Sequence, residues 1–285
     1  MRLQGLLDYY RRSRQTTDLL EALCHAQLRR EYQNIIASSR YDDPRCLTRF
    51  GFKAYSQGDE DGIIEEIFKR IGTTTKQFIE FGVGNGLENN SHYLLHKGWH
   101  GTWIEGDPEK VAAIRRKFEP VITGGQLRVE QLFITRDNIN GKIEEVAGGE
   151  GVDLLSVDID GNDYEVLKSI TCISPRVVIV EYNAKYRPPV EWVMKYDSSH
   201  SWDGTDNFGA SLKSFELLLA SRGYSLVGCS TTGVNAFFVR NDLVNEELFL
   251  APFDSETHYE PYRHMFNRAF VSGFPASEHP IHVSK

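Results

Sequence analysis

A glycine-rich turn is the feature that most constrains how this chain folds. Gly82, Gly84 and Gly86 stand two residues apart, directly after the apolar run 77–81 and before a helical pattern at 90–97. Glycine lacks a Cβ and reaches positive φ, so such a turn lets a ligand approach the backbone closely. A turn that needs only positive φ would also explain the glycines. The flanking strand and helix favour the ligand-binding interpretation.

Strand patterns alternate with helix patterns between about residues 55 and 240. The expected strands are 77–81, 101–105, 126–131, 152–157, 176–181, 225–229 and 236–240. The expected helices are 60–71, 90–97, 108–118, 138–146, 164–170 and 211–221. This alternation predicts an α/β, Rossmann-like fold with a mainly parallel seven-stranded sheet and helices on both faces. The linker 230–235 is too short for a crossover helix, so the C-terminal strand should run antiparallel to its neighbours.

The segments on either side of this pattern differ from it. Residues 1–50 carry nine Arg, with apolar residues at helical spacing, which predicts a helical N-terminal extension. Its arginines are read first as a solvated helix face, and the sequence leaves open whether it packs on its own domain or in a homo-oligomer. We divide the chain into an extension, 1–54, a ligand-binding domain, 55–241, with a loop at 184–210, and a tail, 242–285, whose role the sequence does not indicate.

Composition and charge exclude several classes of function. A net charge of -8 argues against a nucleic-acid partner, because phosphate binding needs a clustered basic surface. Charged residues at Asp8, Arg11 and Arg12 interrupt the start of the chain before a secretory core could form, and no later apolar run would span a bilayer. We therefore expect a cytoplasmic protein with no membrane partner. The cysteines are scattered and expected to be reduced: Cys24, Cys46, Cys172 and Cys229.

A carboxylate after the second strand identifies the class of ligand. Glu105 ends the run 101–105, where an acid can accept hydrogen bonds from both hydroxyls of an adenosine ribose. NAD and S-adenosylmethionine both carry that ribose. The GxGxG spacing lacks the third glycine of the dinucleotide pattern, and Glu80 would repel a pyrophosphate but suits an ammonium group and a positive sulfur. S-adenosylmethionine is therefore the favoured cofactor.

Three segments carry a resemblance to a known family. Residues 56–62 (Ser-Gln-Gly-Asp-Glu-Asp-Gly), 80–90 and 157–164 (Val-Asp-Ile-Asp-Gly-Asn-Asp-Tyr) resemble FkbM-type class I methyltransferases, over about 55–240. The resemblance implies O-methylation of a sugar or natural-product hydroxyl, with Gln57 and Glu60 near the methionine end of the cofactor. The expected cofactor-binding residues are Gln57, Glu80, Gly82, Gly84, Gly86, Asn90, Glu105, Gly106, Phe133 and Asp158.

Acidic residues end the fourth and fifth strands. Their oxygens should meet at the carboxyl edge of the sheet, where they could hold Mg²⁺ or another divalent cation. The expected metal ligands, by similarity to macrocin-type sugar methyltransferases, are Asp158, Asp160, Glu181 and Asn183. The chain departs from that type with Glu-Tyr-Asn in place of paired acids after the fifth strand, and from the FkbM pattern with Asp-x-Asp-Gly after the fourth. The alternative is that Asp160 and Asp163 cap the following helix.

An alcohol needs a base or a cation to react at neutral pH. Asp158, Asp160 and His200 are the expected catalytic residues, and His200 is the base if no metal is present. The loop around it is too long for an idle connection and should bind a small-molecule acceptor. Its aromatic residues suited to stacking on a ring are Tyr186, Trp192, Tyr196 and Trp202. Its polar residues suited to orienting or deprotonating the acceptor are Lys185, Arg187, His200 and Asp203.

Two further interpretations stay open at this point. A nicotinamide-dependent oxidoreductase would use the same glycine turn and Glu105, and a non-catalytic scaffold would keep the fold alone. An amine acceptor also remains compatible with the loop. His92 and His96 have a spacing that can bind metal, although helix packing is the expected reason for them.

Overall fold

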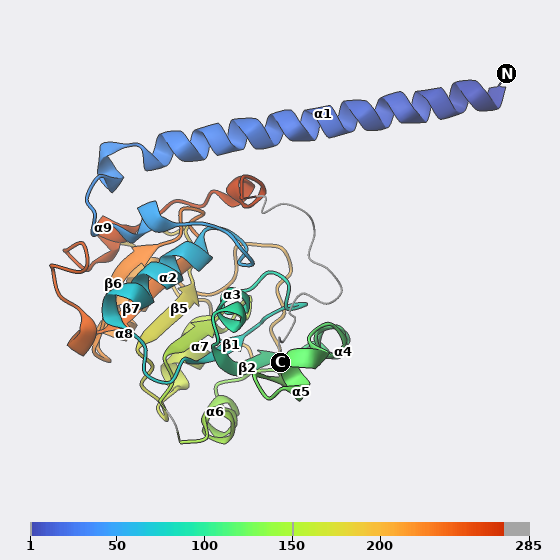
Figure 1. The fold of residues 1–285 in the computed structure, drawn as a ribbon. Helices are drawn as coiled ribbons and strands as arrows, with labels where there is room; N and C mark the ends of the chain where they lie inside the picture. Colours follow the sequence, from blue (N-terminus) through green and yellow to red (C-terminus); the bar gives the residue numbers. More distant parts are fainter. Residues whose placement is uncertain (1, 150, 271–285) are drawn as a thin grey trace.

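The computed structural model describes residues 2–149 and 151–270, with the backbone alone for 2–12. Seven strands form one sheet in the order β3-β2-β1-β4-β5-β7-β6 (Figure 1). The strands are β1 (Gln77–Phe81), β2 (His100–Glu105), β3 (Leu127–Gln131), β4 (Leu154–Val157), β5 (Val177–Glu181), β6 (Tyr224–Cys229) and β7 (Asn235–Arg240). The helices are α1 (Arg2–Ile36), α2 (Glu60–Ile71), α3 (His92–His96), α4 (Pro108–Lys117), α5 (Glu119–Thr123), α6 (Ile139–Ala147), α7 (Asp163–Ser169), α8 (Leu212–Ala220) and α9 (Ser255–His258). Short 3₁₀ turns are η1 (Ser39–Tyr41), η2 (Leu47–Phe50), η3 (Asn241–Leu243) and η4 (His264–Arg268).

The direction of the strands confirms the predicted fold class. β1 pairs parallel with β2 and β4, and β5 continues the parallel set beside β4. β7 is antiparallel to both β5 and β6. The short linker between β6 and β7 therefore forms a hairpin, as its length predicts.

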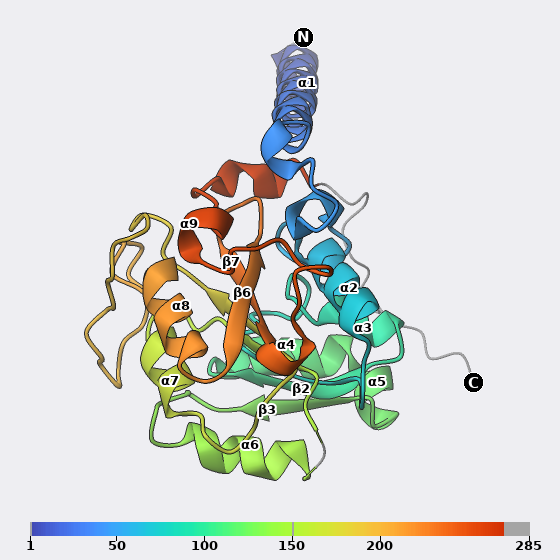
Figure 2. The same cartoon turned by 90° about the vertical axis from the view of Figure 1, so that its left-hand side faces the viewer.

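Alternating side chains on the strands bury two cores, one on each face of the sheet. In β1, Ile79 and Phe81 join the core under α6, α7 and α8, whereas Phe78 joins the core under α2, α3 and α4. Residues two apart on a strand point to the same face, so the strand supplies both layers. Figure 2, turned by 90°, shows helices on both sides of the sheet.

Two parts of the fold differ from the expectation. α4 ends at Lys117, and a separate short helix, α5, follows, with Pro120 in its first turn. Proline is tolerated at the start of a helix because its missing N–H would be unbonded there. The tail also contains α9 and η4, and the remainder of the predicted tail, 271–285, lies outside the described residues.

The N-terminal extension consists of α1, a helix of 35 residues that is about 52 Å long at 1.5 Å per residue, followed by η1 and η2. Its C-terminal part packs on the tail: Leu28 contacts the cluster of Phe266 and Ala269, and the Tyr32 ring lies 4.7 Å from that of Phe270. The rest of α1 projects away from the sheet (Figure 1). Within residues 2–149 and 151–270, no helix combines the length and the apolarity needed to cross a membrane.

Candidate functional site

The loop after β1 is held tightly against the loop after β4. Gly82 has φ +70°, and a Cβ there would stand 1.6 Å from the carbonyl oxygen of Asp158. Gly86 has φ +76°, and a Cβ there would stand 2.8 Å from the ring of Trp103. Gly84 has φ +58° with nothing within 4 Å of its Cβ position. Two glycines are thus required by protein neighbours, and the middle one leaves open space.

The buried carboxylate of Glu80 holds the end of this loop by hydrogen bonds. Its carboxylate accepts hydrogen bonds from the N–H of Asn90 at 2.8 Å and of Ser91 at 2.9 Å, and from the Ser91 hydroxyl. Burial raises the pKa of Glu80 to about 7. The Asn90 side chain donates to Ser156 Oγ at 3.1 Å. Neither Glu80 nor Asn90 lines the two cavities at this edge, so any effect of theirs on a ligand acts through the loop.

The first cavity, named here the Glu105 cavity, encloses about 240 Å³ beside the carboxyl ends of β1, β2 and β4. Glu105 accepts hydrogen bonds from the N–H of Gly84 at 2.8 Å and of Asp107 at 3.0 Å, which fixes its carboxylate at the cavity. Phe133 adds an aromatic ring that is 52% exposed. The lining residues used below are Gly82, Glu105, Gly106, Phe133, Asp160, His200 and Trp202.

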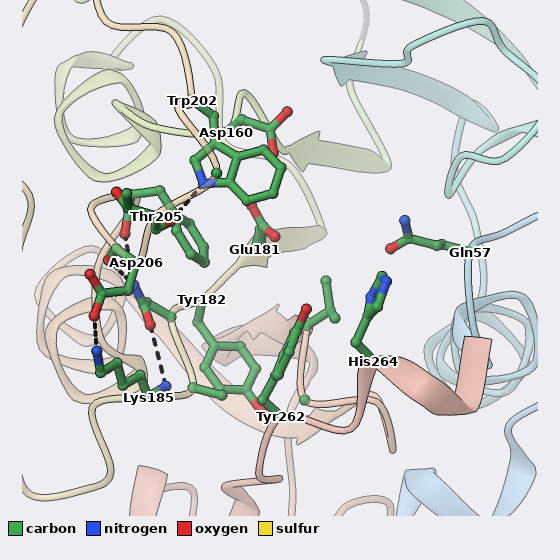
Figure 3. A pocket seen from close by; sticks show the side chains of 16 residues that line it. Gln57, Asp160, Glu181, Tyr182, Lys185, Trp202, Thr205, Asp206, Tyr262 and His264 are labelled. Carbon is green, nitrogen blue, oxygen red and sulfur yellow. Dashed lines mark hydrogen bonds and ion pairs between the residues drawn. The ribbon is translucent and has the colours of Figure 1, made fainter. Parts of the chain in front are cut away.

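The second cavity, named the Glu181 cavity, is larger and encloses about 570 Å³ (Figure 3). It is lined by residues that lie far apart in the sequence. Those used below are Gln57, Asp160, Glu181, Asn183, Lys185, Trp202, Asp206, Tyr262 and His264. Of these, Tyr262 and His264 belong to the tail, whose role could not be predicted from the sequence.

Asp160 and Trp202 line both cavities, so the cavities meet at these two side chains. Asp160 has φ +53°, which is uncommon for a residue with a side chain and often marks a functional position. Its carboxylate accepts no hydrogen bond from the described part of the chain, and burial raises its pKa. Asp160 therefore presents an unengaged carboxyl group at the junction.

Three carboxyl groups gather there. One oxygen of each of Asp158, Asp160 and Glu181 lies within 4.8 Å of the others. Burial, and then the charges of neighbouring carboxylates, raise the pKa values of Asp158 and Glu181 well above their ordinary range. Because these two carboxyl groups lie close together, the negative charge of each disfavours ionisation of the other. Glu181 Oε2 is buried and has no partner among the described residues.

Asn183 is engaged differently from these three acids. Its Nδ2 donates to the carbonyl oxygens of Asp206 at 2.8 Å and Phe208 at 3.2 Å, and its Oδ1 accepts from the Lys185 N–H at 3.3 Å. It ties the loop to the end of β5. Three of the four expected metal ligands thus come together, while the amide of Asn183 is already bonded to the backbone.

The turn before α7 is held by Asp163. Its carboxylate accepts from the N–H of Ile159 at 2.7 Å and of Gly161 at 2.8 Å. Asn162 occupies the N-cap position without a side-chain capping bond. Among the described residues, neither Asp160 nor Asp163 accepts a hydrogen bond from the N–H group of a later residue of α7, so the capping alternative was wrong for both, and Asp163 instead holds the turn before the helix.

The loop carrying His200 is fastened over this turn. Asn162 Nδ2 donates to the Asp197 carbonyl at 2.7 Å, and the Asp197 N–H donates to Asn162 Oδ1 at 3.2 Å. The His200 ring covers Gly161, where a Cβ would stand 2.3 Å from His200 Cδ2. His200 Nε2 is buried without a partner among the described residues, and the ring lines the Glu105 cavity.

Only one of the four loop aromatics proposed for stacking lines either cavity. The rings of Tyr186 and Trp192 stack on each other with centroids 4.2 Å apart, and Tyr196 lies under the guanidinium of Arg136 at 4.2 Å. Trp202 is the exception. Among the polar loop residues, Lys185 forms an ion pair with Asp206.

Of the remaining motif residues, Glu60, His92 and His96 contact other parts of the protein, and Gln57 lines a cavity. Glu60 accepts from the Gly58 N–H at 2.7 Å and from Asn235 Nδ2 at 3.2 Å, whereas Gln57 lines the Glu181 cavity. His92 and His96 stack with the ring of Tyr55, at 3.9 and 5.0 Å between centroids. These stacks agree with the expected packing role of the two histidines.

Comparisons with known proteins give one family. Residues 63–226 match the model of the methyltransferase FkbM domain. No curated protein matches the chain. Among solved structures, it is similar to an S-adenosylmethionine-dependent methyltransferase from Clostridium acetobutylicum ATCC 824, with 13% identity, a TM-score of 0.41, and 66% of this chain and 92% of that one covered. It is also similar to the S-adenosylhomocysteine-bound Podospora anserina methyltransferase PaMTH1, with 14% identity, a TM-score of 0.41, and 79% and 95% of the two chains covered.

Proposed function

The chain belongs to the FkbM methyltransferase family, and from that premise we propose that it methylates a hydroxyl of a sugar or natural-product acceptor with S-adenosylmethionine. One observation carries this proposal. A cavity with an acid suited to a ribose and a larger cavity suited to an acceptor meet at Asp160 and Trp202. Methyl transfer requires that two ligands meet end to end, which such a junction allows.

The residues of the Glu105 cavity fit the cofactor. Glu105 would accept hydrogen bonds from the ribose hydroxyls, because its carboxylate is fixed by the N–H groups of Gly84 and Asp107. Phe133 offers an exposed ring against which an adenine could stack. Gly84 leaves the open space that a ligand beside the turn needs. When bound, S-adenosylmethionine supplies an electrophilic methyl group on a positively charged sulfur.

Asp160 is the residue we assign to proton removal. The attacking hydroxyl oxygen must give up its proton as it bonds to the methyl carbon. Asp160 faces both cavities, accepts no hydrogen bond from the described residues, and has a pKa raised by burial, which makes its carboxylate a better proton acceptor. The charges of Lys110 and, to a smaller extent, His200 favour the ionised form of Asp160, so we assign these two residues of the Glu105 cavity a supporting role.

A divalent cation is a second proposal for the same position. Asp158, Asp160 and Glu181 would hold it through oxygen, and the buried, unpartnered Glu181 Oε2 supports this assignment. A bound cation would lower the pKa of an acceptor hydroxyl. If the cation is needed, EDTA lowers methyl transfer at least tenfold and Mg²⁺ restores it, with cofactor affinity unchanged. Unchanged turnover after EDTA treatment and dialysis would remove the cation from the proposal.

Calorimetric titration tests the cofactor itself. We expect S-adenosylmethionine and S-adenosylhomocysteine to bind in the micromolar range, and NADH not to bind. The Gly84→Val variant should lose both ligands while its melting temperature shows that it still folds, because its side chain would enter the open space at the turn. Binding of NADH alone would favour the oxidoreductase interpretation, and binding of neither ligand would favour a scaffold.

A further inference from the structure

The tail reaches the acceptor side of the site. Tyr262 and His264 line the Glu181 cavity, although the family match ends at residue 226. We call residues 259–264 the tail segment. Its position on the cavity raises the question of whether its backbone is fixed well enough to recognise a ligand.

Hydrogen bonds fix the tail segment to the carboxyl edge of the sheet. The Tyr182 hydroxyl donates to the Glu260 carbonyl at 2.6 Å, and the Tyr259 hydroxyl donates to the Ala184 carbonyl at 2.6 Å. The Arg263 N–H donates to the Thr232 carbonyl at 2.7 Å. These bonds attach the segment both to the end of β5 and to the turn before β7.

A buried carboxylate adds a second set of bonds. Glu260 accepts from the Tyr41 hydroxyl at 2.8 Å and from Arg263 at 2.7 Å, and pairs with Arg40 at 3.2 Å. Gly233 lies directly beneath the segment, where a Cβ would stand 2.3 Å from the Pro261 carbonyl oxygen. Residues from both ends of the chain thus hold the tail segment in one place.

The rings that this segment carries stay exposed. Tyr262 is 62% exposed and stacks on His264, with ring centroids 5.8 Å apart and an angle of 10° between the planes. Trp202, 51% exposed, approaches the same cavity from the loop, and its Nε1 donates to the Thr205 carbonyl at 2.7 Å. Figure 3 shows Trp202 on one side of the cavity and Tyr262 and His264 on another, with Glu181 between them. Exposed aromatic faces on fixed supports are suited to stacking on a ring.

The charges of the lining select against an anion. Lys185 is paired with Asp206, so the imidazole of His264 is the remaining basic group in the lining, against the carboxyl groups of Asp160 and Glu181. An acceptor with a phosphate or carboxylate near its reacting hydroxyl would meet charge of the same sign.

We infer that Tyr262 and His264 are specificity-determining residues, which together with Trp202 hold an uncharged ring of the acceptor between aromatic faces. This inference rests on the proposed function. It assigns the tail segment, outside the matched domain, a direct part in choosing the acceptor.

Binding to the full chain saturated with S-adenosylhomocysteine tests the inference. The uncharged probes are methyl α-D-glucopyranoside, methyl α-D-mannopyranoside, methyl α-L-rhamnopyranoside and catechol, and the anionic ones are glucose 1-phosphate and mannose 1-phosphate. We expect at least one uncharged ring to bind, at least tenfold more tightly than either phosphate. Equal or tighter binding of a phosphate, or no binding of any uncharged ring, would overturn the inference.

Variants then assign the selection to the tail. Tyr262→Ala should weaken binding of the best uncharged probe at least tenfold with the affinity for S-adenosylhomocysteine unchanged, and Tyr262→Phe should retain binding. Met265→Ala is the matched control, because Met265 is 68% exposed, lies next to the segment and is not in the cavity lining. Wild-type affinity in Tyr262→Ala would overturn the assignment. Failure of the unmodified protein to bind S-adenosylhomocysteine would instead contradict the proposed function.

Discussion

The two cavities at the carboxyl edge of the sheet are built in different ways. The Glu105 cavity is lined by residues that follow β1, β2, β3 and β4, together with the short stretch 200–202. The Glu181 cavity takes residues from 57, before the sheet, to 264, beyond its last strand. The first is a property of the α/β core, whereas the second depends on the segments that surround it. A change in the tail should therefore alter the acceptor and leave the cofactor in place.

Asp160 belongs to both cavities, so its substitution should have the largest effect. Asp160→Asn keeps a side chain that tolerates positive φ but removes the proton acceptor. Methyl transfer should fall by about 10²- to 10⁴-fold, the usual contribution of a general base. Affinity for S-adenosylmethionine, measured by calorimetry, should change little.

Turnover within about threefold of the unmodified protein in Asp160→Asn would reject this residue as the base. His200→Ala, made in parallel, distinguishes the alternatives. If His200 is the base, turnover should fall further in His200→Ala than in Asp160→Asn. Asp160 would then only position the groups at the junction of the two cavities.

Phe133→Ala is the counterpart, in the Glu105 cavity, of the tail variant Tyr262→Ala. Both rings are more than half exposed, so neither substitution should unfold the protein. Loss of an aromatic stack on a base costs about 1–3 kcal/mol, so the dissociation constant for S-adenosylmethionine should rise by a factor of about 5 to 150. Binding of an uncharged ring probe should not change. If Phe133→Ala and Tyr262→Ala affect both ligands alike, the two cavities are not independent.

Acid should destabilise the fold through His258, a buried histidine of the tail. His258 in α9 is buried against the Leu250 carbonyl, and burial lowers its pKa from 6.5 to about 4. Between these values the unfolded chain binds the proton and the folded chain does not, so stability falls as the pH decreases from about 6.5 to about 4. Protonation of this one residue in the unfolded chain lowers the free energy of unfolding at pH 5 by about 2 kcal/mol.

Denaturant unfolding at several pH values measures this effect. His258→Gln should be the less pH-dependent variant, because it keeps a polar side chain and cannot titrate there. If the free energy of unfolding changes equally with pH in the unmodified protein and in His258→Gln between pH 6.5 and 5, His258 is not the cause.

Local patterns explain which parts of the molecule could be predicted. The bounds of α2 and β1 follow from residue spacing, and the antiparallel β7 follows from the length of one linker. The Glu105 cavity is also local, since Glu105 ends a predicted strand and Gly82 and Asp160 each follow one within three residues. Parallel strands bring their carboxyl ends to one edge, so strand positions alone bring these residues together.

Long-range contacts explain the rest. Tyr262 reaches the Glu181 cavity because Glu260 bonds to Tyr41, more than 200 residues earlier in the chain, and no local pattern encodes that pairing. The aromatic residues of the tail were visible in the sequence but had no partner to explain them. The prediction for Tyr186 and Trp192 failed in the opposite way. Both rings were expected to stack on the acceptor, but they stack on each other.

A crystal structure with S-adenosylhomocysteine bound would test the central claim most directly. The account predicts the ribose hydroxyls within hydrogen-bond distance of the Glu105 carboxylate, the adenine beside Phe133, and the sulfur turned toward Asp160 and the Glu181 cavity. Adenosine bound in the Glu181 cavity, or a sulfur turned away from Asp160, would contradict it.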